Sequence, residues 1–271
     1  MIYQNYMPKK FLKDLICFCN QIAIKGTSMQ YIVIIPARYK SERLPGKPLA
    51  NISGLPMIVR TYNQCRKVVT KDKIIVATDS SKITKLCKNY KINSILTSTK
   101  CLTGTDRVAE VAKKINCKFY INVQGDEPFF NPSDLKKLII EAKKNPKEIF
   151  NGYTEIKDKE LFFNSTIPKL VFDKKNYLLY MSRAPIPANK KYDFQKAWRQ
   201  VCAYSYPKKA LLNFAKNKKK TPIEFYEDIE ILRFIELGYK VKMLKMSNKS
   251  LSIDTENDLD KAEIYLKFKK I

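Results

Sequence analysis

Four short aliphatic runs alternate with segments of helical periodicity in the first half of the chain, and this alternation limits the fold more than any other feature. The runs are Tyr31–Ile35, Ile74–Ala77, Ile92–Leu96 and Phe119–Val123. Between them, apolar residues recur three or four positions apart. Strands that alternate with helices form βαβ units, so the sequence predicts an α/β, Rossmann-like fold with a mostly parallel sheet and helices on both faces. The chain has no GxGxxG loop, which argues against a dinucleotide-binding domain.

The segment after the first predicted strand is rich in cations. Pro36 ends the aliphatic run, a Leu-Pro-Gly turn follows at 44–46, and four basic side chains surround that turn: Arg38, Lys40, Arg43 and Lys47. A strand that delivers cations into a constrained loop is typical of a polyanion site, and we expect a nucleoside triphosphate. The alternative is a solvated basic loop, but such a loop has little need of the rigid turn.

A second predicted strand ends in residues of opposite charge. Phe119–Val123 is followed by Gln124, Gly125, Asp126 and Glu127. Ligands of open α/β sheets bind beyond the carboxyl ends of the strands, so we expect the acidic and basic loops to lie at one edge. Mg²⁺ prefers one or two carboxylates together with phosphate oxygens and water. Asp126 is therefore a candidate metal ligand, and its alternative role is that of a turn residue.

The composition excludes several classes of site. The chain has 271 residues and no histidine, which removes histidine-based catalytic triads, histidine proton shuttles and histidine-bound zinc. Its seven cysteines form no CxxC pair, as expected of reduced cysteines in a cytoplasmic protein. The formal net charge of +26 raises a nucleic acid as partner, but the lysines are scattered and not interleaved with aromatic residues, so we expect no nucleic-acid binding. The apolar part of the first 28 residues is too short and too polar to span a membrane, and we expect no membrane insertion.

The pattern changes after Lys147. Short extended segments at Lys169–Phe172, Leu178–Met181 and Cys202–Tyr206 predict a small inserted antiparallel subregion. A helix from about Glu224 to Gly238, a strand at Val241–Leu244 and a final amphipathic helix are expected to follow. We therefore expect a dispensable extension at 1–28 and a single domain at 29–271, with a nucleotide-binding part at about 29–148, the inserted subregion at about 149–206 and a C-terminal return at about 207–271.

Six motifs occur in order along the chain. They are PARYKSERLPGKPL (36–49), ATD (77–79), TGTDR (103–107), NVQGDEP (122–128), YMSRAPIP (180–187) and DTEND (254–258). Together they resemble the 3-deoxy-manno-octulosonate cytidylyltransferase family, also called CMP-KDO synthetases, from about Met29 to Phe268. The resemblance implies a nucleotidyltransferase fold, a homodimer, and transfer of CMP from CTP to an eight-carbon sugar acid (KDO) for lipopolysaccharide synthesis.

The resemblance also implies roles for individual residues on the nucleotide side. Lys47, Arg43 and Asp126 would be catalytic, with Lys47 countering charge on the departing pyrophosphate. Asp254 would share the metal, Mg²⁺, with Asp126, although a helix N-cap explains Asp254 equally well from local sequence. The remaining nucleotide contacts would be Pro36, Ala37, Arg38, Asp79, Thr103, Gly104, Thr105 and Arg107. For Thr105, helix capping is an alternative that is compatible with ligand binding.

On the sugar side, the resemblance points to Ser182 and Arg183, because arginine can bind a carboxylate with two hydrogen bonds. Arg183 could instead be a surface arginine beside a proline-rich turn. The other expected sugar contacts are Gln124, Gln200 and Glu227. Gln200 and Phe225 stand where family members commonly carry histidine.

Those two departures leave the identity of the sugar open. A modified substrate such as 8-amino-KDO is one alternative to KDO. Two other functions are compatible with parts of the sequence. A nucleotidyltransferase acting on a sugar 1-phosphate usually has a glycine-rich loop after its first strand, and Pro-Ala-Arg stands there instead. A basic nucleic-acid-binding protein would need clustered charge with stacking aromatics.

Overall fold

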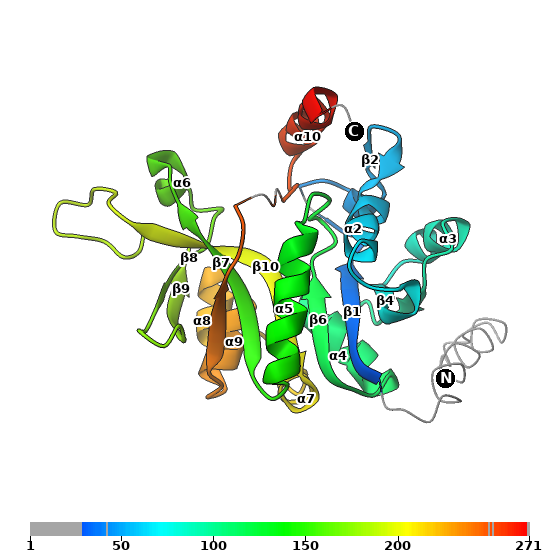
Figure 1. Cartoon of the computed structure of the whole chain (residues 1–271), viewed down its shortest axis with the longest axis horizontal. Coiled ribbons are helices and arrows are strands. Elements are labelled where there is room, and N and C mark those ends of the chain that lie inside the picture. The colour runs from blue at the N-terminus through cyan, green and yellow to red at the C-terminus, as the bar shows by residue number, and fades with distance from the viewer. Residues whose placement is uncertain (1–28, 42, 249, 251, 270–271) are drawn as a thin grey trace, which may run out of the picture.

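A computed structural model describes residues 29–41, 43–248, 250 and 252–269 (Figure 1). The extension expected at 1–28 lies outside the described residues. Nine strands form one mixed sheet in the order β11-β7-β10-β6-β1-β4-β5, with β8 paired to β10 and β9 paired to β8. The strands are β1 (Met29–Ala37), β4 (Ile74–Thr78), β5 (Ser94–Leu96), β6 (Cys117–Val123), β7 (Ile149–Ile156), β8 (Lys169–Phe172), β9 (Leu178–Ser182), β10 (Ala197–Pro207) and β11 (Val241–Lys245).

Helices cover both faces of the sheet. They are α2 (Met57–Arg66), α3 (Ser81–Asn89), α4 (Gly104–Lys114), α5 (Pro132–Lys144), α6 (Lys159–Phe163), α7 (Lys208–Phe214), α8 (Pro222–Glu227), α9 (Ile231–Glu236) and α10 (Glu256–Lys269). Alternate residues of β1 enter two separate cores, because successive side chains of a strand point to opposite faces. Ile32 and Ile34 pack with α4, α7 and α9, whereas Val33 and Ile35 pack with α2, α3 and α5. The predicted α/β fold with a mostly parallel sheet is confirmed.

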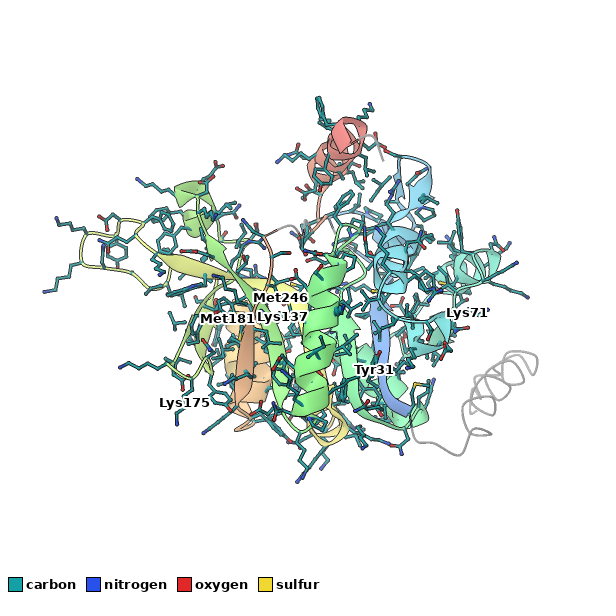
Figure 2. All side chains as sticks on the ribbon, viewed as in Figure 1. Tyr31, Lys71, Lys137, Lys175, Met181 and Met246 are labelled. Carbon is teal, nitrogen blue, oxygen red and sulfur yellow. The ribbon has the colours of Figure 1, made fainter. Side chains whose placement is uncertain are left out.

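Short connecting elements precede and follow α2 in the chain. They are the 3-10 helices η1 (Lys47–Leu49) and η2 (Lys71–Lys73) and the hairpin of β2 (Asn51–Ile52) with β3 (Leu55–Pro56). Figure 2 labels Lys137 and Met246 close together on the side where α5 crosses the sheet, and Lys137 Nζ donates to the carbonyl of Lys245 at 2.7 Å. The end of β11 is thereby attached to α5.

Some of residues 149–206 form strands of the main sheet, and the others form an addition beside it. β10 lies between β6 and β7 and pairs antiparallel with both, so the predicted extended segment Cys202–Tyr206 is the end of an eleven-residue central strand. Only β8, β9 and α6 form an antiparallel addition beside it. The polar residues Arg199 and Gln200 interrupt the apolar residues in the first part of β10, so an analysis of hydrophobic runs does not detect this part of the strand.

The single helix expected at about Glu224 to Gly238 is wrong. Two short helices, α8 and α9, occupy this range, and Asp228 between them has a left-handed backbone with φ of 50°. The Asp228 carboxylate accepts from Lys220 and lies 3.8 Å from Arg183. These tertiary contacts hold Asp228 in a conformation that interrupts the helix.

Candidate functional site

The basic and acidic loops meet at one edge of the sheet, as the sequence predicts. β1 and β6 are parallel neighbours, so the residues after Ala37 and after Val123 emerge side by side. Gly125 allows this approach, because a Cβ atom at that position would stand 2.7 Å from the carbonyl oxygen of Pro36. That distance is shorter than a Cβ atom tolerates, and a larger residue would separate the two loops.

The ammonium group of Lys47 joins the two aspartates expected at a metal site. Lys47 Nζ is 2.6 Å from Asp126 Oδ2 and 2.8 Å from Asp254 Oδ1. Arg43 adds a contact of 3.0 Å to the same oxygen of Asp254. Although 128 positions apart in sequence, the two carboxylates therefore lie in one cluster with two predicted triphosphate ligands.

The aspartates determine the charge state of the lysine. Lys47 is only 9% exposed, and burial by itself lowers the pKa of its ammonium group. The carboxylates of Asp126 and Asp254 outweigh this effect and raise the pKa above its usual value. Lys47 consequently remains a cation, which is the state needed to bind a polyphosphate.

The same two carboxylates fit a divalent cation. Both already bind a common positive charge, and their side chains are about one-third exposed, which leaves an approach from solvent. Among the described residues, no group of three or more acidic, cysteine or histidine side chains is arranged to hold a metal ion. Asp126 and Asp254 would thus supply two ligands, and phosphate oxygens and water would supply the rest, as is usual for Mg²⁺.

Glu127 lies beside this cluster and was not predicted as a functional residue. Its side chain is buried, and Oε1 accepts a hydrogen bond of 2.6 Å from Ser252 Oγ. Burial, the largest effect, together with the charge of Asp126, raises the pKa of Glu127 to about 7 in spite of the Ser252 hydrogen bond. Its place in the NVQGDEP motif was the available sequence signal.

Asp79 and Arg107 bind each other beneath the basic loop. Arg107 NH2 is 2.6 Å from Asp79 Oδ2, and its NH1 donates to Thr97 Oγ1 at 2.9 Å. Asp79 also accepts from the backbone amide of Tyr39, which fixes the loop that carries Arg38. In this structure the pair shapes the loop, and Arg38 itself is exposed.

The N-terminus of α4 is occupied by a carboxylate of the protein itself. Glu230 accepts hydrogen bonds from the amides of Gly104 and Thr105, at 3.1 and 2.9 Å, and from Thr105 Oγ1. Thr103 forms a capping box with Asp106. The amides expected to receive a ligand group are therefore already bonded, and the predicted nucleotide contact of these residues would have to use other atoms.

Gln124 packs against the start of α4. Its side-chain amide is 3.1 to 3.2 Å from the position of a Cβ atom on Gly104, and Pro36 Cγ is 3.3 Å from the same position. The small residue at 104 allows Gln124 and Pro36 to pack against the start of α4. This contact brings together residues from the first, third and fourth motifs.

On the sugar side, Glu227 is the centre of a hydrogen-bonded group. Its carboxylate accepts from Ser182 Oγ at 2.6 Å, from Tyr180 OH at 3.1 Å and from the Arg183 amide at 2.8 Å. Burial alone would raise the pKa of Glu227, but the Ser182, Arg183 and Tyr180 hydrogen bonds lower it overall. Three predicted sugar residues are therefore neighbours, and Glu227 is an anion.

The guanidinium group of Arg183 binds backbone oxygens. It donates to the carbonyls of Glu227, Ser165, Thr166 and Asp228. Beneath it, the buried Lys169 donates to the carbonyls of Asn164 and Arg183. Burial, aided by the charge of Arg183, lowers the pKa of Lys169 to about 8.

The two positions where family members commonly carry histidine have different surroundings. Gln200 is buried, and its Nε2 donates to Asn151 Oδ1 at 3.0 Å and to Tyr204 OH at 3.2 Å. Phe225 is 66% exposed on α8. Gln200 thus belongs to a polar group inside the sheet region, whereas Phe225 lies on the surface.

Arg233 on α9 and Glu230 at the N-cap of this helix connect the two sides of the site, and neither was predicted. Arg233 is fully buried, binds both oxygens of Glu224 and lies 3.3 Å from Asp106 on α4. An arginine or glutamate on a short helix has no local sequence signature. Their roles depend on contacts with residues of α4, which are distant in sequence.

Comparison with known proteins identifies the family. A model of the cytidylyltransferase family matches residues 32–258. The 3-deoxy-manno-octulosonate cytidylyltransferase of Protochlamydia amoebophila is 36% identical over 245 residues, covering 88% of this chain and 94% of that relative. The chain belongs to the 3-deoxy-manno-octulosonate cytidylyltransferase family.

Two further relatives of this family extend the comparison. The mitochondrial 3-deoxy-manno-octulosonate cytidylyltransferase of Arabidopsis thaliana is 34% identical over 236 residues, covering 85% of this chain and 81% of the plant protein. A solved structure of CMP:2-keto-3-deoxy-manno-octonic acid synthetase complexed with CTP superposes with a TM-score of 0.81 at 29% identity. It covers 89% of this chain and 99% of that chain. The fold and the motifs thus lead to the same family.

Proposed function

We propose that this protein transfers CMP from CTP to the anomeric hydroxyl of KDO and releases pyrophosphate, supplying the activated sugar for lipopolysaccharide synthesis. The observation that carries the proposal is the cluster in which Lys47 lies between Asp126 and Asp254, with Arg43 beside it. The names of the relatives in the same family support the choice of CTP and KDO.

The chemistry requires positioning and charge neutralisation more than covalent participation of the protein. The sugar hydroxyl oxygen forms a bond to the α-phosphorus, the bond from that phosphorus to the bridging oxygen breaks, and pyrophosphate leaves with the electron pair. Arg38, Arg43 and Lys47 hold the triphosphate, and Lys47 offsets the charge that develops on the leaving group. A divalent cation held by Asp126 and Asp254 would polarise the phosphate and lower the pKa of the attacking hydroxyl, which suits a chain without histidine.

For the sugar acid, the group around Glu227 provides an ordered polar surface. Ser182 and Glu227 would bind sugar hydroxyls, and the charge of Arg183, held in place by backbone carbonyls, would attract the sugar carboxylate. Gln124 would bind the sugar beside the nucleotide. The buried amide of Gln200 would determine which ulosonic acid fits best, with 8-amino-KDO the main alternative to KDO.

We further propose Mg²⁺ as the cofactor, a homodimer as the assembly and the cytoplasm as the compartment. The large apolar side chains of Phe225 and Tyr226 are exposed next to each other on α8, as expected of a surface covered by a second subunit. Within the part of the chain that the structure describes, every helix is too short or too polar to cross a bilayer. Light scattering coupled to size-exclusion chromatography would test the dimer.

Pyrophosphate release tests the activity. The purified protein should release pyrophosphate from CTP in the presence of Mg²⁺ and KDO, and ATP, GTP or UTP should support little reaction. A panel of ulosonic acids, including 8-amino-KDO, would identify the preferred acceptor. Activity on sugar 1-phosphates without activity on any ulosonic acid would contradict the proposal.

A further inference from the structure

Asp254 lies on a long connection between β11 and α10 and depends on side-chain contacts for its position. Near the start of the connection, the Ser247 amide donates to Asp134 Oδ1 at 3.0 Å, and Ser247 Oγ donates to Asp134 Oδ2 at 2.6 Å. Asn131 Nδ2 donates to Ser247 Oγ at 2.8 Å. These bonds hold the start of the connection, but they lie seven residues before Asp254.

Closer to Asp254, the connection is attached to the loop that carries Asp126. The amide of Ile253 donates to the Asp126 carbonyl at 3.0 Å, and Ser252 Oγ donates to Glu127 Oε1 at 2.6 Å. The two residues before Asp254 thus bind the backbone of Asp126 and the side chain of Glu127. These two hydrogen bonds attach the connection to the Asp126 loop immediately before Asp254, next to the Lys47 ammonium group that bridges the two carboxylates.

Glu127 is an unusual choice of side chain for its location. It is only 3% exposed, and its second oxygen, Oε2, has no hydrogen-bond partner among the described residues. Burying a carboxyl group that is only partly hydrogen-bonded costs stability. A residue that makes folding less favourable is expected where it serves another purpose, and the side-chain hydrogen bond of Glu127 goes to Ser252 in the Asp254 connection.

We propose that Glu127 is a positioning residue that, through Ser252, holds Asp254 at the separation from Asp126 at which both carboxylates bind one cation. In this structure, the cation that both carboxylates bind is the Lys47 ammonium group. Under the proposed function, both carboxylates bind a divalent metal during catalysis. Groups that orient metal ligands through hydrogen bonds commonly change metal affinity by about 10- to 100-fold when they are removed. Glu127 acts through Asp254 and need not touch the substrate.

Mn²⁺ binding in the presence of CTP tests this proposal without measuring turnover. The free Mn²⁺ concentration can be followed by electron paramagnetic resonance, with Mn²⁺ as the probe for the divalent site. We expect Ser252→Ala and Glu127→Met each to weaken Mn²⁺ binding by about tenfold. Because both substitutions break the same bond, the double variant should be little worse than either single variant. Glu127→Gln retains an acceptor oxygen and should restore most of the affinity.

The controls separate positioning from general loss of stability. Tyr177→Phe removes a hydrogen bond of 2.8 Å to Glu148, far from the site in sequence, and should leave Mn²⁺ affinity unchanged. Ser252 is exposed, so Ser252→Ala should fold even if Glu127→Met does not. Wild-type Mn²⁺ affinity in Ser252→Ala would overturn the positioning role alone. Failure of the wild-type protein to bind Mn²⁺ with CTP would overturn the metal site of the proposed function as well.

Discussion

Replacing Lys47 by methionine removes the ammonium group that lies between Asp126 and Asp254 and leaves a side chain of similar length. In the absence of metal, the two carboxylates then face each other without a shared cation. We expect the variant to unfold more easily than the wild-type protein in EDTA. Its rate of CMP transfer should fall by about a hundredfold or more, because charge on the departing pyrophosphate loses its partner.

The size of the stability effect follows from the geometry. Lys47 Nζ is 2.6 and 2.8 Å from the two carboxylate oxygens, so these oxygens lie at most about 5.4 Å from each other. At an effective dielectric constant of about 20, like charges at this distance repel by about 3 kcal/mol, and the variant lacks the ammonium group that offsets this repulsion in the wild-type protein. The aspartate side chains are 34% and 38% exposed, and solvent screening reduces the expected loss to about 2 kcal/mol.

Urea unfolding in EDTA and in Mg²⁺ measures this effect. Because no ammonium group competes for the carboxylates, Mg²⁺ should stabilise Lys47→Met more than it stabilises the wild-type protein. Lys40→Met is the matched control, since it removes one exposed lysine from the same loop and should change stability little. Equal unfolding free energies of wild-type and Lys47→Met proteins in EDTA would refute the reasoning.

Three further predictions concern other parts of the site. Asp126→Asn and Asp254→Asn should each leave the fold nearly intact and remove most CMP transfer. Turnover within a few-fold of wild type would exclude a metal role for the substituted residue. A loss of stability without a loss of turnover would show that Asp254 is only a helix cap. Because burial and Arg183 lower the pKa of Lys169 from 10.5 to about 8, the unfolded chain binds more protons between these values, and the free energy of unfolding should rise with pH across that range. Urea unfolding of Lys169→Met should lack this rise, and identical pH slopes in both proteins would contradict the assignment. Gln200→His should change the preference among KDO and its analogues more than it changes the KM for CTP, and unchanged kinetics on every sugar acid would show that this position does not influence the substrate.

The parts of the fold with local sequence signals were predictable. Aliphatic runs and helical spacing indicated β1 and β6, and their parallel pairing brings Asp126 to the basic loop by a general rule of sheet geometry. Asp254 had no such local signal, because the residues that bring it to Lys47 lie more than 120 positions away. Only the resemblance to a known family predicted that it belongs to a metal site with Asp126.

Contacts between distant segments explain what the sequence did not reveal. Asp228 interrupts a helical pattern because Lys220 and Arg183 bind it, and neither partner is evident from the local pattern. Glu230 fills the N-terminus of α4 from a helix 125 residues further along the chain. The sequence motif around Thr105 predicts a helix start, but it carries no information about which carboxylate occupies that start.

The position of β10 between β6 and β7 has a consequence for how the chain acquires its structure during synthesis. Until residue 207 has left the ribosome, one edge of β6 has no partner. Until Glu230 follows, the amides of Gly104 and Thr105 at the start of α4 lack their acceptor. An unpaired edge strand promotes association with other chains. The half of the chain that carries the basic and acidic loops is therefore not an autonomous folding unit, and a fragment ending near residue 148 should aggregate where the whole chain folds.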